Sequence, residues 1–235
     1  SDNTAVGKSA LAANTTGTLN TAIGQNAGAA ITTGIRNTTV GAASLDAEVA
    51  GHYSTAMGYG ALSVQSNSSS TDVYNTAVGY LAGAVVTTGV NNTFIGGLSG
   101  DANTTGGANT SVGMSALTAN TTASNNTAVG KSALTANTTG DALVAVGVNA
   151  LAANTTAADN VAVGVNALFT NTTGASNTAM GKDALKVNTT GANNVAVGGL
   201  ALDANTTGAS NVAVGKLSLS ANTTADGNSA FGHEA

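Results

Sequence analysis

Two segments carry the lysine and hydroxyl pair that ends a phosphate-binding loop, Gly7-Lys8-Ser9 and Gly130-Lys131-Ser132. Such a loop needs a glycine five residues before its second glycine, so that the backbone can wrap around the phosphates. The chain has Asp2 and Asn125 at those places. The two segments therefore do not predict a nucleotide site.

The titratable side chains form no catalytic or metal-binding pattern. The two histidines, His52 and His233, are far apart in sequence, and the chain has no cysteine. Gly96–Asp101 is similar to a calcium-binding nonapeptide, but its third glycine is misplaced and the segment occurs once. We expect no enzymatic activity, no cofactor and no metal site. Five further carboxylates share no single repeat position and suggest only solubility: Asp141, Asp159, Asp183, Asp203 and Asp226.

The aromatic side chains are the best candidates for contact with a partner. All four tyrosines gather in one part of the chain with His52, on a surface otherwise made of Asn and Thr. Aromatic rings are enriched at binding interfaces. The sequence therefore predicts a receptor contact there, and the alternative is that the rings only pack down a loop. The candidate residues are His52, Tyr53, Tyr59, Tyr74 and Tyr80.

These residues are carried by a repeat that returns fourteen times, and twelve of its thirteen intervals have the same length as the interval from Gly7 to Gly24. A short fixed period is typical of a solenoid, in which each coil buries its apolar face only by stacking on its neighbours. The repeat is marked by a glycine suited to a tight corner: Gly7, Gly24, Gly41, Gly58, Gly79, Gly96, Gly113, Gly130, Gly147, Gly164, Gly181, Gly198, Gly215 and Gly232.

Numbered from its first Asn, the repeat reads Asn-Thr-Ala-Val-Gly-x-x-Ala-Leu-x-x-Asn-Thr-Thr-Gly-x-x. We expect an all-β parallel β-solenoid, or β-roll, of about fourteen 17-residue coils. Each coil is expected to have two strands, one at Asn-Thr-Ala-Val and one at Ala-Leu, as in Ala116-Leu117, Ala133-Leu134 and Ala184-Leu185. Alternation puts the second and fourth positions on one face. The fourth position is always apolar and the third, on the other face, is Ala in eleven copies. Apolar residues on both faces predict a strand buried twice, the second time against something outside the coil, such as another subunit.

The repeat is interrupted once, by a longer interval between Gly58 and Gly79. Insertions in solenoids become surface loops, so we expect one at about residues 63–74 of a single domain, 1–235. Both ends of the chain are in phase with the repeat, which predicts a fragment of a longer protein. Three coils have glycine in place of leucine, which indicates repeat decay or a differentiated tip: Gly28, Gly83 and Gly100.

Composition excludes several classes of partner. Only 7% of residues are charged, the net charge is −5, and six Lys and Arg are scattered singly, so we expect no nucleic-acid binding. No apolar run approaches the roughly 18 residues of a membrane span, so we expect no membrane insertion by this segment. Asn-Thr-Thr triplets at nine equivalent turns match the glycosylation signal, although Asn and Thr are also good turn formers. They begin at Asn14, Asn103, Asn120, Asn137, Asn154, Asn171, Asn188, Asn205 and Asn222.

Segments such as Asn126–Leu134 and Asn177–Leu185 resemble the head repeats of trimeric autotransporter adhesins. Similar repeats occur in phage tail fibres. The resemblance covers essentially the whole chain and implies a left-handed β-roll, three chains side by side, and an extracellular place on a cell surface or virion. The usual head repeat is shorter, whereas this one has an additional Asn-Thr-Thr-Gly segment, as at Asn137–Gly140.

Three functions are consistent with these observations. The first is a non-enzymatic fibre or adhesin segment that attaches a cell or virion to a surface or host, as a homotrimer with a receptor or glycan as its target. The second is a structural subunit of an extracellular filament. The third is an ice-binding solenoid, but adjacent threonines, unlike alternating ones, point to opposite sides.

Overall fold

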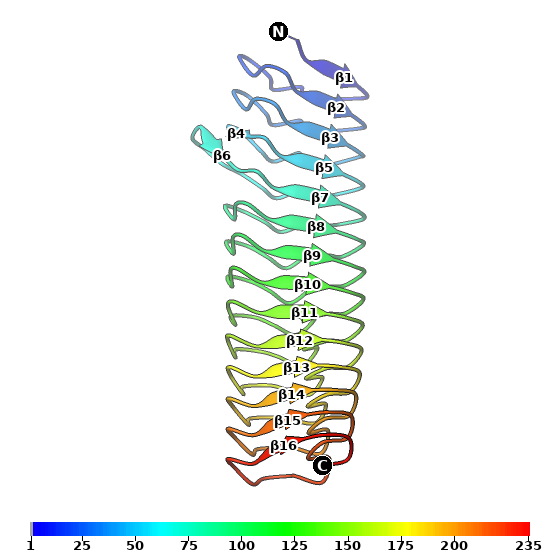
Figure 1. The fold of residues 1–235 in the computed structure, drawn as a ribbon. Helices are drawn as coiled ribbons and strands as arrows, with labels where there is room; N and C mark the ends of the chain where they lie inside the picture. The colour runs from blue at the N-terminus through cyan, green and yellow to red at the C-terminus, as the bar shows by residue number, and fades with distance from the viewer. Residues whose placement is uncertain (1) are drawn as a thin grey trace. The chain divides into compact units, whose positions relative to one another are not determined.

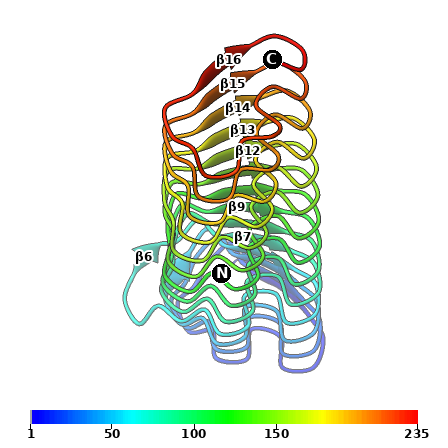
Figure 2. The same ribbon diagram turned by 90° about the horizontal axis from the view of Figure 1, so that it is seen from below.

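The computed structural model describes residues 2–235, which form strands and turns and contain no helix. The chain divides into two compact units, Ser1–Thr122 and Ala123–Ala235. Each unit is a stack of short parallel strands, one per coil (Figure 1). Within each unit, successive coils follow the same path (Figure 2).

In the first unit, each coil strand pairs in parallel with the strand one coil later, and the register joins Thr4 to Thr21. A separate pair, β4 (Gly51–His52) and β6 (Thr71–Asp72), lies beside the stack, and β6 stands outside it in Figures 1 and 2. The coil strands are β1 (Thr4–Val6), β2 (Thr21–Ile23), β3 (Thr38–Val40), β5 (Thr55–Met57), β7 (Thr76–Val78), β8 (Thr93–Ile95) and β9 (Thr110–Val112).

The second unit repeats this arrangement, with Val144 in register with Val161, the equivalent residue of the next coil. Both units are parallel β-solenoids, and their coil strands confirm the expected period and fold class. The strands are β10 (Thr127–Val129), β11 (Val144–Val146), β12 (Val161–Val163), β13 (Thr178–Met180), β14 (Val195–Val197), β15 (Val212–Val214) and β16 (Ser229–Phe231).

The prediction of a second strand in each coil is wrong, because the Ala-Leu segments lie in turns. In one such segment Gly130, Ser132 and Leu134 have φ of +136°, +57° and +52°, whereas a parallel strand needs φ near −120°. Leu134 is nevertheless fully buried. Leucine therefore enters the coil interior from a left-handed turn, a conformation that costs of order 1–3 kcal/mol and persists only where packing enforces it.

The repeated corner glycines adopt a backbone conformation that only glycine takes readily, with φ between +130° and +141° at all fourteen. A Cβ on Gly130 would lie 2.5 Å from the carbonyl oxygen of Gly147 in the next coil. The coils therefore approach too closely at this corner for any side chain.

Strand faces follow the expected alternation. In β12, Ala162 is fully buried while Val161 and Val163 are partly exposed. The residue at the inward position is small because the interior of each coil is narrow. The leucine and alanine side chains fill this interior. The second and fourth positions point out of the coil.

Two ladders of asparagine side chains complete the interior. Asn177 donates its backbone N–H to Oδ1 of Asn160 (2.8 Å) and its Nδ2 to the carbonyl of Gly191 (2.8 Å). Asn188 donates its Nδ2 to Oδ1 of Asn171 (2.9 Å) and to the same Gly191 carbonyl (2.9 Å). Buried amides are thus paired from coil to coil, which offsets the cost of removing them from water.

These ladders determine whether the asparagines of the Asn-Thr-Thr triplets are accessible to glycosylation. A glycan on a ladder Asn would break the contacts to two coils, so these amides are inaccessible in the folded chain. Seven of the nine triplet asparagines are fully buried: Asn103, Asn120, Asn137, Asn154, Asn171, Asn188 and Asn205.

Candidate functional site

The four tyrosines form two separate stacks rather than one cluster. Tyr53 and Tyr74 stand two residues before strands β5 and β7, and their rings stack with centroids 5.0 Å apart and planes 5° apart. Tyr59 and Tyr80 stand two residues after the same strands, with ring centroids 5.8 Å apart and planes 14° apart. The structure therefore brings the tyrosines together in pairs, at opposite ends of two neighbouring strands.

Polar partners hold the first stack. Arg36 Nη1 donates a hydrogen bond to the Tyr53 hydroxyl (2.9 Å), and the Tyr74 hydroxyl donates to Asp72 Oδ2 (3.4 Å). Desolvation, and after it the charge of Asp72, raises the pKa of Tyr74, so this hydroxyl stays protonated and remains a donor. Each ring covers one face of the other, and the guanidinium carbon of Arg36 lies over the Tyr53 ring, 5.7 Å from its centroid.

His52 is buried, unlike the tyrosines, with only 8% of its surface exposed. Its Nδ1 accepts the backbone N–H of Ile35 (3.2 Å), and its Nε2 lies 2.7 Å from the Ser70 hydroxyl. A ring whose Nδ1 accepts carries its proton on Nε2, so Nε2 donates to Ser70. His52 therefore anchors the inserted segment and is not an exposed contact residue.

Glu48 organises the insertion, and sequence reasoning did not identify it. Its buried Oε1 accepts four backbone N–H groups, from Val49, Ala50, Gly51 and Asn67, at 2.8–3.2 Å. Its Oε2 accepts Nε2 of Gln65 (2.8 Å) and Nδ2 of Asn67 (2.9 Å). A buried carboxylate with six donors is a structural anchor. The signal was available, because Glu48 replaces a ladder Asn at the twelfth repeat position.

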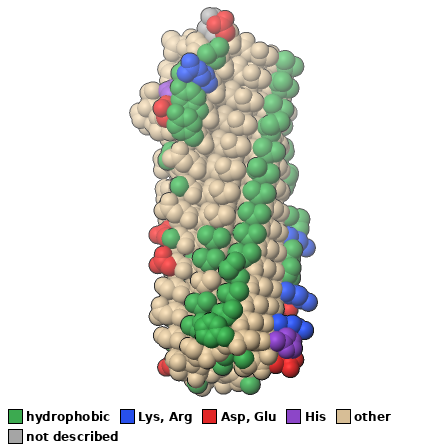
Figure 3. Space-filling view, in the orientation of Figure 1, with side chains coloured by type: hydrophobic (Ala, Val, Ile, Leu, Met, Phe, Trp, Pro, Cys, Tyr) green, Lys and Arg blue, Asp and Glu red, His purple; other side chains and the backbone are tan. Residues whose placement is uncertain are grey.

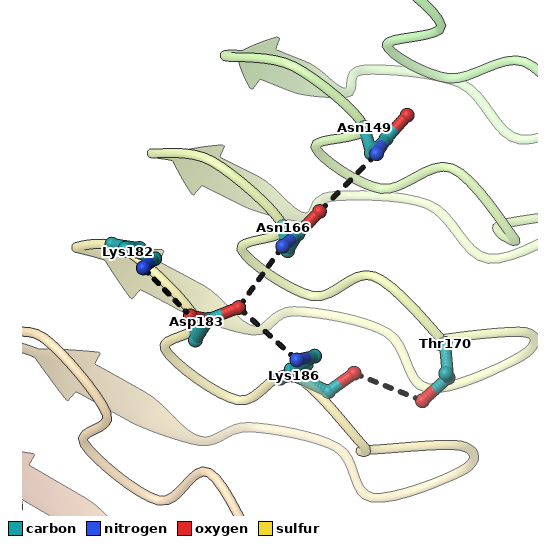
Figure 4. Close-up of polar contacts among 6 residues, drawn as sticks. All are labelled: Asn149, Asn166, Thr170, Lys182, Asp183 and Lys186. Atoms are coloured by element: carbon teal, nitrogen blue, oxygen red, sulfur yellow. Dashed lines mark hydrogen bonds and ion pairs between the residues drawn. The ribbon is translucent and has the colours of Figure 1, made fainter.

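The second unit contains one charged network, centred on Asp183 (Figure 4). Asn149 donates to Asn166 (3.2 Å), Asn166 donates to Asp183 Oδ1 (3.1 Å), and Lys186 Nζ lies 3.3 Å from the same oxygen. Lys182 Nζ lies 3.8 Å from Oδ2. Burial raises the pKa of Asp183, but the Asn166 hydrogen bond and the two lysines together lower it below its ordinary value. The network links three coils, and the lowered pKa keeps the Asp183 carboxylate ionised near neutral pH.

Three carboxylates share one repeat position, five residues after the corner glycine. Burial raises the pKa of each, and backbone hydrogen bonds reduce that effect only in part: Asp46, Asp101 and Asp203. They lie in separate coils, and within residues 2–235 no group of three His, Cys, Asp or Glu is placed to hold a metal ion.

The outward face of the coil strands presents continuous rows of apolar side chains. In the first unit the second repeat position is Thr in every coil strand and the fourth is Val, Ile or Met, which gives one apolar row (Figure 3). In the second unit Val occupies both positions in four of the seven strands. Its apolar rows contain Val144, Val146, Val161, Val163, Val195, Val197, Val212 and Val214, with exposed Met180 and Phe231 in the fourth-position row.

Charges of opposite sign border this face in the second unit. Exposed lysines follow the strands by two residues, and exposed aspartates precede them by two or three. The basic edge contains Lys131, Lys182, Lys216 and His233, and the acidic edge contains Asp141, Asp159 and Asp226.

The adjacent threonines do not form a double row of free hydroxyls. In most pairs the first threonine donates to a backbone carbonyl one coil later, as Thr155 does to Thr172 (3.2 Å), whereas the second, such as Thr156, is exposed. The Asn-Thr-Thr turns therefore expose one threonine row, which gives no support to the ice-binding alternative.

The chain matches no protein-family model, and a search of curated proteins gave no significant match. None of the described segments is a helix long and apolar enough to cross a membrane.

Proposed function

We propose that this chain is a non-enzymatic segment of an extracellular fibre or adhesin on a cell or virion, and that it assembles as a homotrimer. The resemblance to adhesin heads and tail fibres motivates the proposal, and the valine face of the second unit carries it. An apolar surface that follows a whole stack of strands marks an interaction site.

The charged edges favour a parallel arrangement of the copies. If neighbouring copies are related by a rotation axis parallel to the strand stack, the acidic edge of one face meets the basic edge of the next. If a neighbour is instead turned end for end across the face, like charges meet, which is unfavourable. A cyclic assembly with its axis along the stack therefore pairs both edges and covers the valines.

Light scattering on the purified chain tests this proposal. The expected mass is about three times 22.3 kDa. Val197→Glu places a charge in the middle of the partly exposed face and should yield monomers that remain folded. Thr173→Glu, at an exposed position of the Asn-Thr-Thr turns, is the matched control and should leave the mass unchanged.

A wild-type chain that is a single monomeric species would overturn the trimer. Growth into rods that depends on concentration would instead favour the structural filament subunit. Loss of assembly in both glutamate variants would show that added charge, rather than the valine face, is responsible.

A further inference from the structure

A row of exposed side chains follows the corner glycines of the first unit, at the sixth repeat position. Tyr59 and Tyr80 are each 57% exposed and Met114 is 52% exposed. Between Tyr80 and Met114 the row has Gly97, and a Cβ built there meets nothing within 4 Å. Gly97 therefore leaves a gap in the row, between the exposed side chains of Tyr80 and Met114.

Backbone hydrogen bonds hold the three residues in line on successive coils. The N–H of Leu98 donates to the carbonyl of Tyr80 (2.9 Å), and the N–H of Ser115 donates to the carbonyl of Gly97 (3.0 Å). Parallel strands are spaced about 4.8 Å apart, so Tyr80 and Met114 are separated by roughly 9.6 Å. Residues 2–235 enclose no pocket, and this gap is open on its outer side.

The ring of Tyr80 has one free face. Its other face stacks on Tyr59 in the preceding coil, so the free face is turned toward Gly97 in the following coil. The gap therefore has an aromatic face as one wall, glycine backbone as its floor and the thioether chain of Met114 as the opposite wall.

The size of the gap suits a puckered six-membered ring. Carbon atoms in contact lie about 3.5–4.0 Å apart, so a flat aromatic ring between two walls needs roughly 7–8 Å and leaves slack in this gap. A saturated ring with axial hydrogens is thicker and fills it more closely.

The surroundings are uncharged and mostly apolar, and the gap is open to water on its outer side. Ile95, 39% exposed, ends strand β8 two residues before Gly97, and partly exposed threonines stand at the other ends of the same strands, Thr76, Thr93 and Thr110. Strands β7, β8 and β9 contain no charged residue. A sugar ring has the matching chemistry, because it presents C–H groups on its faces and hydroxyls around its rim.

We propose that Tyr80, Gly97 and Met114 form a binding site for one pyranose ring of a neutral polysaccharide. This site deepens the proposed attachment function and rests on it. It lies in the first unit, whereas the proposed assembly face belongs to the second.

The test fills the gap without disturbing the fold. Gly97 is not in the left-handed region and has free space at Cβ, so Gly97→Leu should fold normally and block the site. Gly199→Leu is the matched control, because Gly199 has the same repeat position in the second unit and a Cβ there meets only the Lys182 carbonyl, at 3.8 Å.

The probes are maltohexaose, cellohexaose and mannohexaose. Their binding is measured by saturation-transfer NMR and by tyrosine fluorescence, which is suitable because the chain has four tyrosines and no tryptophan. We expect at least one hexasaccharide to bind the wild type and Gly199→Leu with a Kd on the order of 1 mM, and Gly97→Leu to lose at least about tenfold in affinity.

The proposal is overturned if none of the three sugars binds at about 20 mM, or if Gly97→Leu binds as tightly as the wild type. Binding of N-acetyltryptophanamide without binding of any sugar would overturn it in favour of a protein side chain. Light scattering on the same samples separates the two proposals: a trimer that binds no sugar removes only the sugar site, and a monomer that binds sugar removes only the trimer.

Discussion

The ring of Phe94 occupies the space that a side chain at Gly100 would need, since a Cβ built on Gly100 would overlap the ring. The same ring lies 2.8 Å from a Cβ built on Gly83. Most coils have Ala at the Phe94 position and Leu at the two glycine positions. The coils of Gly83 and Gly100 are therefore repacked around one phenylalanine and have not simply decayed, whereas a Cβ on Gly28 would meet Ile31, Leu11 and Thr39.

This relationship predicts a rescue. Phe94→Ala should destabilise the chain by about 3–5 kcal/mol, because it empties space that no neighbouring leucine fills. Adding Gly83→Leu and Gly100→Leu restores the common coil, and both glycines already have a φ of +58°, close to the +52° of Leu134. Chemical denaturation should show that the triple variant recovers most of the loss. A triple variant less stable than Phe94→Ala would contradict the interpretation that the Phe94 ring fills the space of the two absent leucine side chains.

Glu48→Gln should loosen the inserted segment. The variant turns an NH2 group toward N–H donors, so at least one donor loses its acceptor, at a cost of about 2–3 kcal/mol. Amide hydrogen exchange should rise over residues 63–74 while the second unit stays protected. Ser66→Ala, at an exposed position of the same segment, is the control. Unchanged exchange in Glu48→Gln would show that the carboxylate does not hold the loop.

The period and the Asn-Thr-Ala-Val strands were predictable because the repeat itself reports stacking. The absent second strand was not predictable from propensity, since Leu134 adopts a left-handed backbone that only packing against the next coil enforces. The division of the tyrosines into two stacks was readable from repeat numbering: Tyr53 precedes a strand by two residues, and Tyr59 follows the same strand by two.

The anchoring roles of His52 and Glu48 depend on contacts between coils, which a single repeat does not contain. A residue that departs from the consensus at an inward position is nevertheless a usable signal. Glu48 stands where a ladder Asn belongs, and Ser54 stands where the other ladder has Asn. Gln65 reaches Ser54 (3.0 Å) as well as Glu48, so the departures compensate one another.

Asp101→Ala should stabilise the chain at neutral pH. Oδ1 of Asp101 is buried without a hydrogen-bond partner, and burial raises the pKa above the ordinary 3.8. A raised folded-state pKa means that the protonated carboxyl favours the fold: this contribution is complete below about pH 3.8 and is lost as the pH rises through the folded-state pKa. We expect a gain of about 0.5–1 kcal/mol at pH 7 that shrinks toward pH 3. Thermal unfolding at the two pH values measures it, and an equal gain at both would contradict the account.

Asp183→Asn should have the opposite dependence on pH. The pKa of Asp183 is lowered, so the carboxylate stabilises the fold above its unfolded pKa of about 3.8, and this contribution is lost as the pH falls through the lower folded-state value. The asparagine still accepts from Asn166 but loses the attraction of the lysines, so we expect a loss of about 1 kcal/mol at pH 7 that closes near pH 2. Thermal unfolding across this pH range measures the difference, and a loss that stays constant down to pH 2 would contradict the role of the carboxylate charge.

A comparison of the two lysines tests whether the stabilisation comes from their contacts with Asp183 or from their positive charge in general. The side chain of Lys186 is 43% exposed and lies 3.3 Å from the carboxylate, whereas that of Lys182 is 75% exposed and lies 3.8 Å away. Closer and less solvated charges interact more strongly, so Lys186→Met should cost more stability than Lys182→Met, which should change it by less than about 0.5 kcal/mol. Unfolding of both variants in the Asp183→Asn background should show no further difference between them. A difference that persists there would mean that Lys186 acts through packing of its chain and not through the carboxylate.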